Sequence, residues 1–200
     1  MKLNKINLSS ILLLLITINL IANDVNIKKE VEKHIRLAKV YKQKNEFIKS
    51  ENEFLEAAKL MPENAVLWSY VGDAAKHNKE YTNAIKYFKK AIKLNPKLIK
   101  SYGNIAYIYQ RQKKYKESIS YYEKVLLLDE NNMMAITALV EIYLQLKNLE
   151  KCELYINKFD IIVDSMNKEN MTKIQMEKIE KTKLRFSAYR KFIKIKRQNL

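Results

Sequence analysis

The chain has 200 residues, of which 48% are hydrophobic and 30% are charged, a balance typical of one folded domain or a short repeat array. Only Gly72, Gly103, Pro62 and Pro96 supply glycine and proline, so an all-β fold, a dinucleotide-binding turn and a phosphate-binding loop are disfavoured. The 38 basic and 22 acidic residues give a net charge of +16, which suits an anionic partner.

The first 22 residues have the pattern of a secretory signal peptide. Two lysines precede an apolar run over residues 8–22, which at about 15 residues is shorter than the roughly 20 that span a bilayer as a helix. Ala22 is small and suits cleavage after it. Leu20, at the minus-three position, is bulkier than the small residue preferred at that position, so an uncleaved anchor is the alternative. We expect an exported, periplasmic or envelope-associated protein that begins near Asn23, with residues 23–30 as a linker.

Residues 31–166 repeat with a period of 34. The copy at 65–98 sets the pattern: Trp68, Val71, Gly72, Ala75, Tyr81, Ala84, Phe88, Ala91 and Pro96. Apolar residues recur at spacings of three and four on both sides of a polar break, which is typical of two amphipathic helices joined by a turn. We predict helical hairpins at 31–64, 65–98 and 99–132, and a degenerate one at 133–166 that loses the small residues and the proline.

Each residue type in the repeat has a predicted structural role. Gly72 is small enough to let the two helices of its hairpin approach closely, and Phe88 fills the space toward the next hairpin. Trp68 is expected to be buried between the two helices. Pro96 ends the second helix, because the residue before a proline is pushed out of the α region.

These residues match a known family pattern. The signature W-x2-L-G-x2-Y, then A-x3-F, then P is that of the tetratricopeptide repeat, and residues 68–96 resemble it at nearly every position. With its N-terminal segment, the chain resembles an exported bacterial member. The resemblance implies an all-α fold, a right-handed superhelix of about four hairpins closed by a capping helix. His34 in place of the first aromatic residue and Glu130 in place of a proline depart from the pattern.

Residues 167–200 lack the repeat pattern and are expected to form the basic capping helix, within residues 169–197. Leu184, Ala188, Phe192 and Ile195 recur at spacings of four, four and three. We predict that this stripe covers the apolar face of the last hairpin. No acidic residue follows Glu180.

The sequence shows none of the residue constellations of an enzyme or a metal site. His34 and His77 lie in different repeats, with no carboxylate at metal-ligand or triad spacing. We interpret His34 as packed within its hairpin and His77 as a solvated helix end. Cys152 takes the place of Ala84 and Ser118, which favours a small buried residue over a reactive thiol. We expect no catalysis, metal, cofactor or small-molecule substrate.

The family resemblance implies binding. In tetratricopeptide arrays the first helix of each hairpin lines a concave groove that receives an extended peptide or a helix, so we expect a protein–protein interaction adaptor or scaffold with a cell-envelope partner. The implied groove residues are Arg36, Lys39, Lys42, Tyr70, Asp73, Lys76, Lys100, Asn104, Tyr107 and Arg111. Basic residues interleaved with tyrosines suit an acidic peptide or helix. The alternative is that they are the solvated face of a lysine-rich protein.

The carboxylate clamp of cochaperones in this family is not expected here. That clamp needs a paired Lys and Asn on the first helix of its first repeat, where Ile35 and Lys39 stand in this chain. Tyr70 replaces the next Asn, and only Lys100 fits.

The positive charge alone does not identify the partner. Lysines far outnumber arginines, whereas proteins that bind nucleic acids favour the forked donors of arginine. An AT-rich genome would also produce this excess of Lys, Asn, Ile and Tyr. Because an exported chain rarely meets chromosomal DNA, we expect no nucleic-acid binding. The alternative function is a membrane-tethered module, anchored by residues 8–22, whose basic surface binds anionic lipid.

Overall fold

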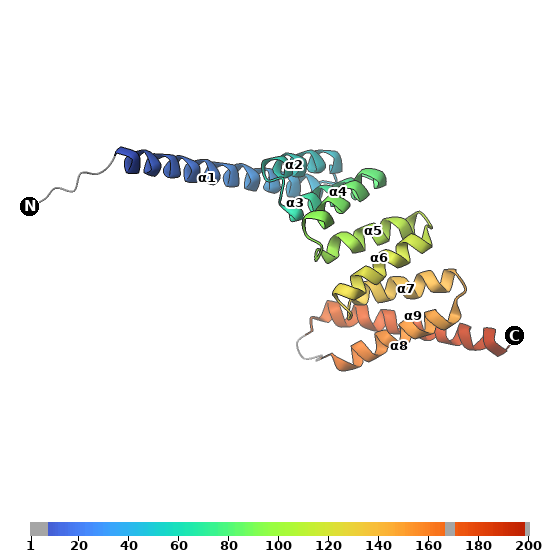
Figure 1. The fold of residues 1–200 in the computed structure, drawn as a ribbon. Coiled ribbons are helices and arrows are strands. Elements are labelled where there is room, and N and C mark those ends of the chain that lie inside the picture. The colour runs from blue at the N-terminus through green and yellow to red at the C-terminus, as the bar shows by residue number, and fades with distance from the viewer. Residues whose placement is uncertain (1–7, 167–170, 199–200) are drawn as a thin grey trace, which may run out of the picture. The chain divides into compact units, whose positions relative to one another are not determined.

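The computed structural model describes residues 8–166 and 171–198, and all regular elements in these ranges are α-helices (Figure 1). The helices are α1 (Leu8–Gln43), α2 (Phe47–Leu60), α3 (Ala65–His77), α4 (Tyr81–Leu94), α5 (Ile99–Arg111), α6 (Tyr115–Leu128), α7 (Met133–Gln145), α8 (Leu149–Ser165) and α9 (Lys173–Gln198). The predicted all-α fold of consecutive hairpins is confirmed. The chain forms two compact units, an N-terminal unit through Ser101 and a C-terminal unit from Tyr102.

The turn inside each hairpin has the same backbone conformation. Asn45, Lys79, Lys113 and Lys147 have φ values of 60°, 66°, 59° and 57°, and they lie one repeat length of 34 residues apart. A residue in this left-handed region closes a helix and lets the next amide reach back to an unpaired carbonyl. The amide of the residue after Lys147 donates to the Tyr143 carbonyl at 2.9 Å. The fourth hairpin therefore keeps the repeat's turn although its sequence is degenerate.

The hairpin of α3 and α4 shows how the repeat residues pack in the N-terminal unit. Trp68 is 7% exposed, and its Nε1–H donates to the Pro62 carbonyl at 2.7 Å. Its ring stacks on Tyr87 of α4, with 6.1 Å between centroids. A Cβ atom at Gly72 would lie 2.9 Å from the Phe88 ring, so glycine is needed for this close approach. The predicted burial of Trp68 and the small residue at position 72 are confirmed.

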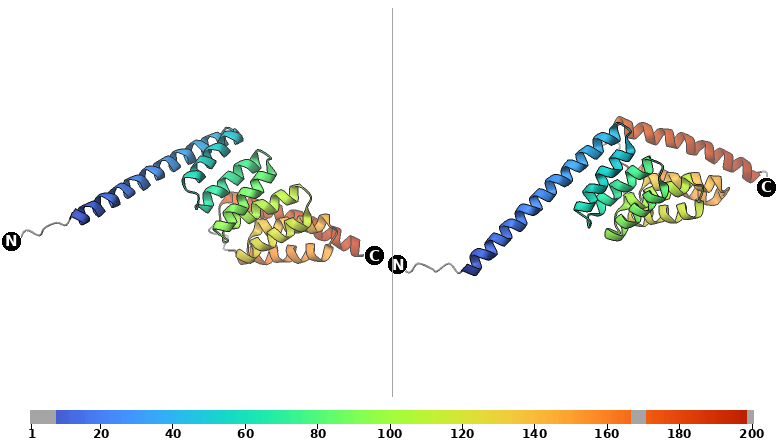
Figure 2. Two further views of the ribbon diagram at one scale, coloured as in Figure 1. Left: turned by 45° about the horizontal axis from the view of Figure 1, so that its top comes forward. Right: turned by 90° about the horizontal axis from the view of Figure 1, so that it is seen from above.

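The first helix starts well before the first repeat. Residues 23–30, expected to be a linker, are part of α1, which is unbroken from Leu8 to Gln43 (Figure 2). The stretch holds no glycine or proline, and Lys28 pairs with Asp24 one turn earlier at 2.6 Å, which favours a helix. Within the described ranges, no helix is both long and apolar enough to cross a membrane.

The C-terminal unit ends in α9, which docks on both helices of the fourth hairpin. Phe186 meets Phe159 of α8 edge to face, with ring centroids 5.0 Å apart. Arg185 pairs with Glu141 of α7 at 2.8 Å, and Arg190 pairs with Asp160 of α8 at 2.7 Å. The predicted capping position is therefore correct, although the expected start near residue 169 lies outside the described residues.

The side of α9 that faces the core differs from the prediction. Ile179, Phe186 and Ile193 are buried, whereas the predicted stripe of Leu184, Ala188, Phe192 and Ile195 is exposed. Residues seven apart lie on the same face of a helix. Because α9 carries apolar residues on two opposite faces, spacing alone did not decide which face packs inward.

Candidate partner-binding surface

The predicted groove residues all lie on first helices of the hairpins, but they belong to two units. The N-terminal unit contains Arg36, Lys39 and Lys42 on α1, Tyr70, Asp73 and Lys76 on α3, and Lys100 at the start of α5. The C-terminal unit contains Asn104, Tyr107 and Arg111, further along α5.

Asp73 joins α1 to α3 through an ion network. Its carboxylate accepts hydrogen bonds from Lys42 of α1 and from Lys76, the latter at 2.7 Å. Burial pushes the pKa of Asp73 upward, but the hydrogen bonds from the two lysines outweigh it and hold the pKa below its ordinary value. Two of the predicted binding cations therefore share one carboxylate. Lys42 joins α1 to α3 through it, whereas Lys76 pairs with it within α3.

Lys39 and Lys100 are the more accessible of the predicted groove lysines in the N-terminal unit. Both are exposed, and neither makes an ion pair with any residue that the structure describes. Arg36 lies 3.6 Å from Glu32, but both side chains are 68% exposed, so this pair contributes little. Tyr70 is 38% exposed and packs its ring 5.2 Å from that of Phe54. The unit thus presents an aromatic ring and two accessible ammonium groups on three successive first helices.

In the C-terminal unit, Tyr107 and Arg111 are exposed on α5, and Asn104 is half-buried. Glu141 on α7, which was not among the predicted residues, pairs with Arg185 of α9. Glu141 follows Tyr107 by one repeat length and Asp73 by two, so extending the template to the degenerate fourth copy would have found it.

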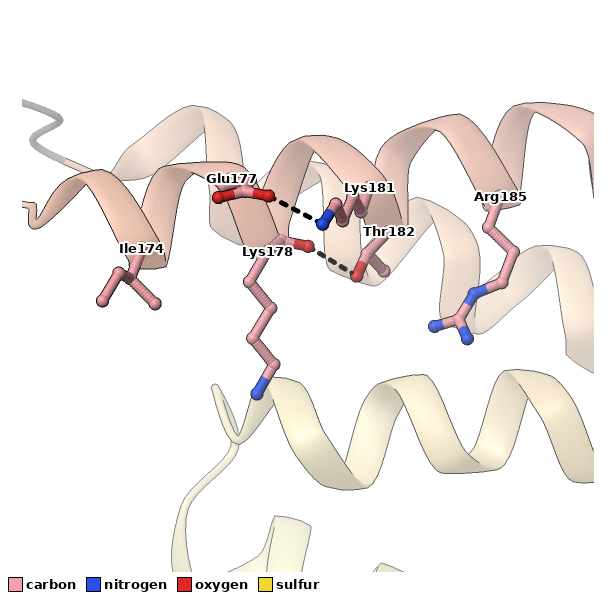
Figure 3. A pocket seen from close by; sticks show the side chains of 6 residues that line it. All are labelled: Ile174, Glu177, Lys178, Lys181, Thr182 and Arg185. Carbon is pink, nitrogen blue, oxygen red and sulfur yellow. Dashed lines mark hydrogen bonds and ion pairs between the residues drawn. The ribbon is translucent and has the colours of Figure 1, made fainter.

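A shallow depression of about 560 Å³ lies beside α9 (Figure 3). Its lining residues are Ile174, Glu177, Lys178, Lys181, Thr182 and Arg185. Lys181 pairs with Glu177 at 2.7 Å, and the Thr182 hydroxyl donates to the Lys178 carbonyl at 2.9 Å. Two of its three cations are paired, Lys181 with Glu177 and Arg185 with Glu141, so we do not assign it a ligand.

The two histidines and the cysteine have ordinary structural environments. His34 is half-buried, with Nδ1 2.6 Å from a Glu53 oxygen, as expected for a residue packed within its hairpin. The side chain of His77 is 41% exposed, and burial of its ring lowers its pKa. Cys152 is buried, and that burial raises the pKa of its thiol, which makes the thiolate scarce at neutral pH. The described residues contain no cluster of three or more metal-ligating side chains.

Glu51 on α2 gives the N-terminal unit a pH-dependent stability. Burial, with the nearby charge of Glu80, raises the pKa of Glu51 to about 7. A carboxyl group with a raised folded pKa contributes its full stability below the unfolded pKa near 4.5, and that contribution falls as the pH rises to about 7. We expect Glu51→Gln to raise the melting temperature above the parent's at pH 8, with little difference at pH 4.

The control for this experiment is Glu63→Gln, which removes an exposed carboxylate from the same unit. Thermal melts of the three proteins from pH 4 to 8 measure the effect. If the melting temperatures of the parent and of Glu51→Gln changed in parallel with pH across this range, Glu51 would have an ordinary pKa.

The repeats match a known family model. Residues 65–98 and 99–132 each match the tetratricopeptide repeat. The chain therefore contains tetratricopeptide repeats. No curated protein matches it significantly.

Solved tetratricopeptide repeat structures share the fold. The Arabidopsis OM64 domain has a TM-score of 0.56 and 20% identity, over 60% of this chain and 98% of its own. MamA has a TM-score of 0.58 and 19% identity, over 67% and 77%. The first such domain of Spaghetti (RPAP3), bound to the HSP90 peptide SRMEEVD, has a TM-score of 0.56 and 22% identity, over 60% and 94%. At these identities the likeness concerns the fold.

Proposed function

We propose that this protein is a non-catalytic adaptor that binds an extended acidic segment of a cell-envelope protein through the first helices of its hairpins. Tetratricopeptide domains are protein–protein interaction modules. The observation that carries the proposal is the exposure of Lys39, Tyr70 and Lys100 on three successive first helices of the N-terminal unit. An ammonium group pairs with a carboxylate, and a tyrosine supplies rigid amphipathic contact area.

Two structural neighbours support an acidic ligand. The first tetratricopeptide domain of RPAP3 is bound to the peptide SRMEEVD, and the second domain of human RPAP3 is in complex with the HSP70 peptide SGPTIEEVD. Both peptides carry several carboxylates. Our chain has Ile35 and Tyr70 where the carboxylate clamp has asparagine or lysine. We therefore propose an acidic segment held by Lys39 and Lys100, and not these chaperone peptides.

Charge reversal tests this proposal. We expect Lys39→Glu with Lys100→Glu to weaken capture of the native partner, recovered by crosslinking from the source cell, at least tenfold. The melting temperature should change little, because exposed unpaired charges contribute little to stability. Binding by the parent should weaken as salt rises from about 0.05 to 0.5 M, since salt screens exposed charges. Measuring capture of the same partner by Arg111→Glu tests whether the C-terminal unit also contributes to binding.

The matched control is Lys86→Glu with Lys89→Glu, which reverses two exposed lysines on the second helix α4 of the same unit. This control should bind like the parent. Unchanged capture by the Lys39 and Lys100 variant, together with binding that is insensitive to salt, would contradict the proposal and assign these cations to an ordinary solvated surface.

We further propose that the protein is exported, with residues 8–22 as the signal segment. Supporting this, the apolar side chains described between Leu12 and Ile21 are exposed, whereas folded soluble proteins rarely leave a long apolar run in water. The intact mass of protein isolated from its source should place the mature N-terminus near Asn23. A mass that includes residues 1–22 would rule out cleavage and support the membrane-tethered alternative.

A further inference from the structure

The helix α9 has two apolar faces, and the described chain covers only one of them. Its inner face carries Ile193, which is 1% exposed, in line with two other buried residues. Its outer face carries Leu184, Phe192 and Ile195, which are 76%, 45% and 56% exposed, together with the exposed Ala188. A helix that is apolar on two sides is typical of one that packs between two partners. We call Leu184, Ala188, Phe192 and Ile195 the outer seam.

The cations of α9 divide between the same two faces. The arginines turn inward, where Arg185, Arg190 and Arg197 pair with Glu141, Asp160 and Glu153 of the fourth hairpin. Lys191 and Lys194 are exposed beside the outer seam, and within the described ranges neither makes an ion pair. The arginines are thus used for docking α9, whereas these lysines remain accessible to a partner.

The geometry of the repeats indicates a helix as the occupant of this face. In the other hairpins the first helix packs against the following second helix, as α3 does on α4 and α7 on α8. α9 docks after α8 as a further first helix would, and among the described residues no following helix covers it. The residues of the outer seam are spaced by four, four and three. Such spacing places them in one narrow stripe along the helix, as at a contact between two packed helices.

The exposed lysines beside the outer seam discriminate between three occupants: a second copy of the chain, a membrane and an acidic partner helix. A parallel second copy, seam against seam, would bring the two pairs of lysines together and be repelled, and an antiparallel copy would place no carboxylate of α9 beside them, since no acidic residue follows Glu180. An interfacial membrane helix has a broad apolar face, whereas the seam here is one residue wide and has Lys191 within its length. A partner helix with carboxylates beside its own apolar stripe satisfies both the seam and the lysines.

We propose that the outer face of α9 is a docking surface for an acidic amphipathic helix of a partner protein. The partner's apolar stripe covers Leu184 and Ile195, and its Asp or Glu side chains pair with Lys191 and Lys194. This surface shares no residue with the binding site proposed above, so either can fail while the other stands.

A synthetic helix tests the proposal. The probe is a labelled 21-residue peptide with leucines at heptad positions a and d and glutamates beside them, and its counterpart has lysines in place of the glutamates. We expect the full chain to bind the glutamate peptide at least tenfold more tightly. Leu184→Ser with Ile195→Ser, and separately Lys191→Glu with Lys194→Glu, should each lower that affinity at least tenfold without moving the melting temperature.

Matched controls remove equally exposed groups elsewhere. Leu127→Ser with Leu154→Ser changes leucines that are 86% and 62% exposed on α6 and α8, and Lys86→Glu with Lys89→Glu reverses lysines on α4. Both controls should bind the glutamate peptide like the parent. Equal affinity for the two peptides, or equal loss in the controls, would overturn the proposal.

Two further measurements address the other occupants. If the chain does not bind the glutamate peptide but binds phosphatidylglycerol vesicles through Leu184 and Ile195, the outer face of α9 is a membrane-binding surface and the proposal is wrong. If analytical ultracentrifugation shows a dimer that Leu184→Ser dissociates, the face belongs to a second copy and the proposal is equally wrong. A monomer that binds neither vesicles nor the lysine peptide, but does bind the glutamate peptide, supports it.

Discussion

Replacing Trp68 with alanine is expected to destabilise the N-terminal unit by about 3–5 kcal/mol, the usual cost of truncating a buried aromatic side chain. Trp68 is 7% exposed and stacks on Tyr87. The ammonium of Lys90 lies 3.4 Å from the ring centroid. The substitution removes both contacts and leaves the Pro62 carbonyl without its donor. Against a domain stability of about 5–15 kcal/mol, the loss would be evident in urea unfolding followed by circular dichroism.

Two variants separate the contributions to this effect. Trp68→Phe keeps an aromatic ring and loses the indole N–H, so it should cost about 1–2 kcal/mol. Tyr70→Ala, two residues along the same helix, removes a ring that is 38% exposed and should cost less than Trp68→Ala. A Trp68→Ala protein that unfolds like the parent would show that the register assigned to this repeat is wrong.

Replacing Phe186 with alanine is expected to cost the C-terminal unit about 3–5 kcal/mol, or to release α9 from the fourth hairpin. Phe186 is fully buried, with its ring against Phe159 at 5.0 Å and against Tyr189 at 6.0 Å. Hydrogen exchange should show faster exchange across α9 amides, while α3 and α4 of the other unit stay protected.

Leu184→Ala on the same helix is the control. Because Leu184 is 76% exposed, this change should leave both exchange and melting nearly unchanged. The reverse result, with Leu184→Ala harmful and Phe186→Ala harmless, would place the predicted stripe inward. The outer seam proposed above would then not exist.

The hairpins could be predicted from the sequence because their packing is repeated. Gly72 and Trp68 mark positions where two helices meet, because Gly72 leaves room for the Phe88 ring and Trp68 is large and apolar. Their recurrence in kind at a period of 34 fixed the register of the repeats. The left-handed turn residues, such as Lys79 and Lys113, were not predicted, because lysine has no preference for that conformation.

The sequence could not reveal interactions that depend on side-chain placement between helices. Lys42 and Lys76 were predicted as binding cations, whereas in the structure both pair with the Asp73 carboxylate. For α9, both Phe186 and Leu184 lie on apolar faces at helical spacing, and only the position of the fourth hairpin decides which one is buried. The absence of any helix breaker explains why α1 continues through residues expected to be a linker.

Site-specific photocrosslinking tests the central claim most directly, that first-helix side chains contact the partner. A photoreactive phenylalanine analogue is placed at Tyr70 or Tyr107, both exposed on first helices, and compared with the same analogue at Leu127 or Leu154 on second helices. Irradiation in the source cell should give a discrete protein adduct from the first-helix positions, and none from the second-helix positions. Adducts confined to Leu127 or Leu154 would contradict the account.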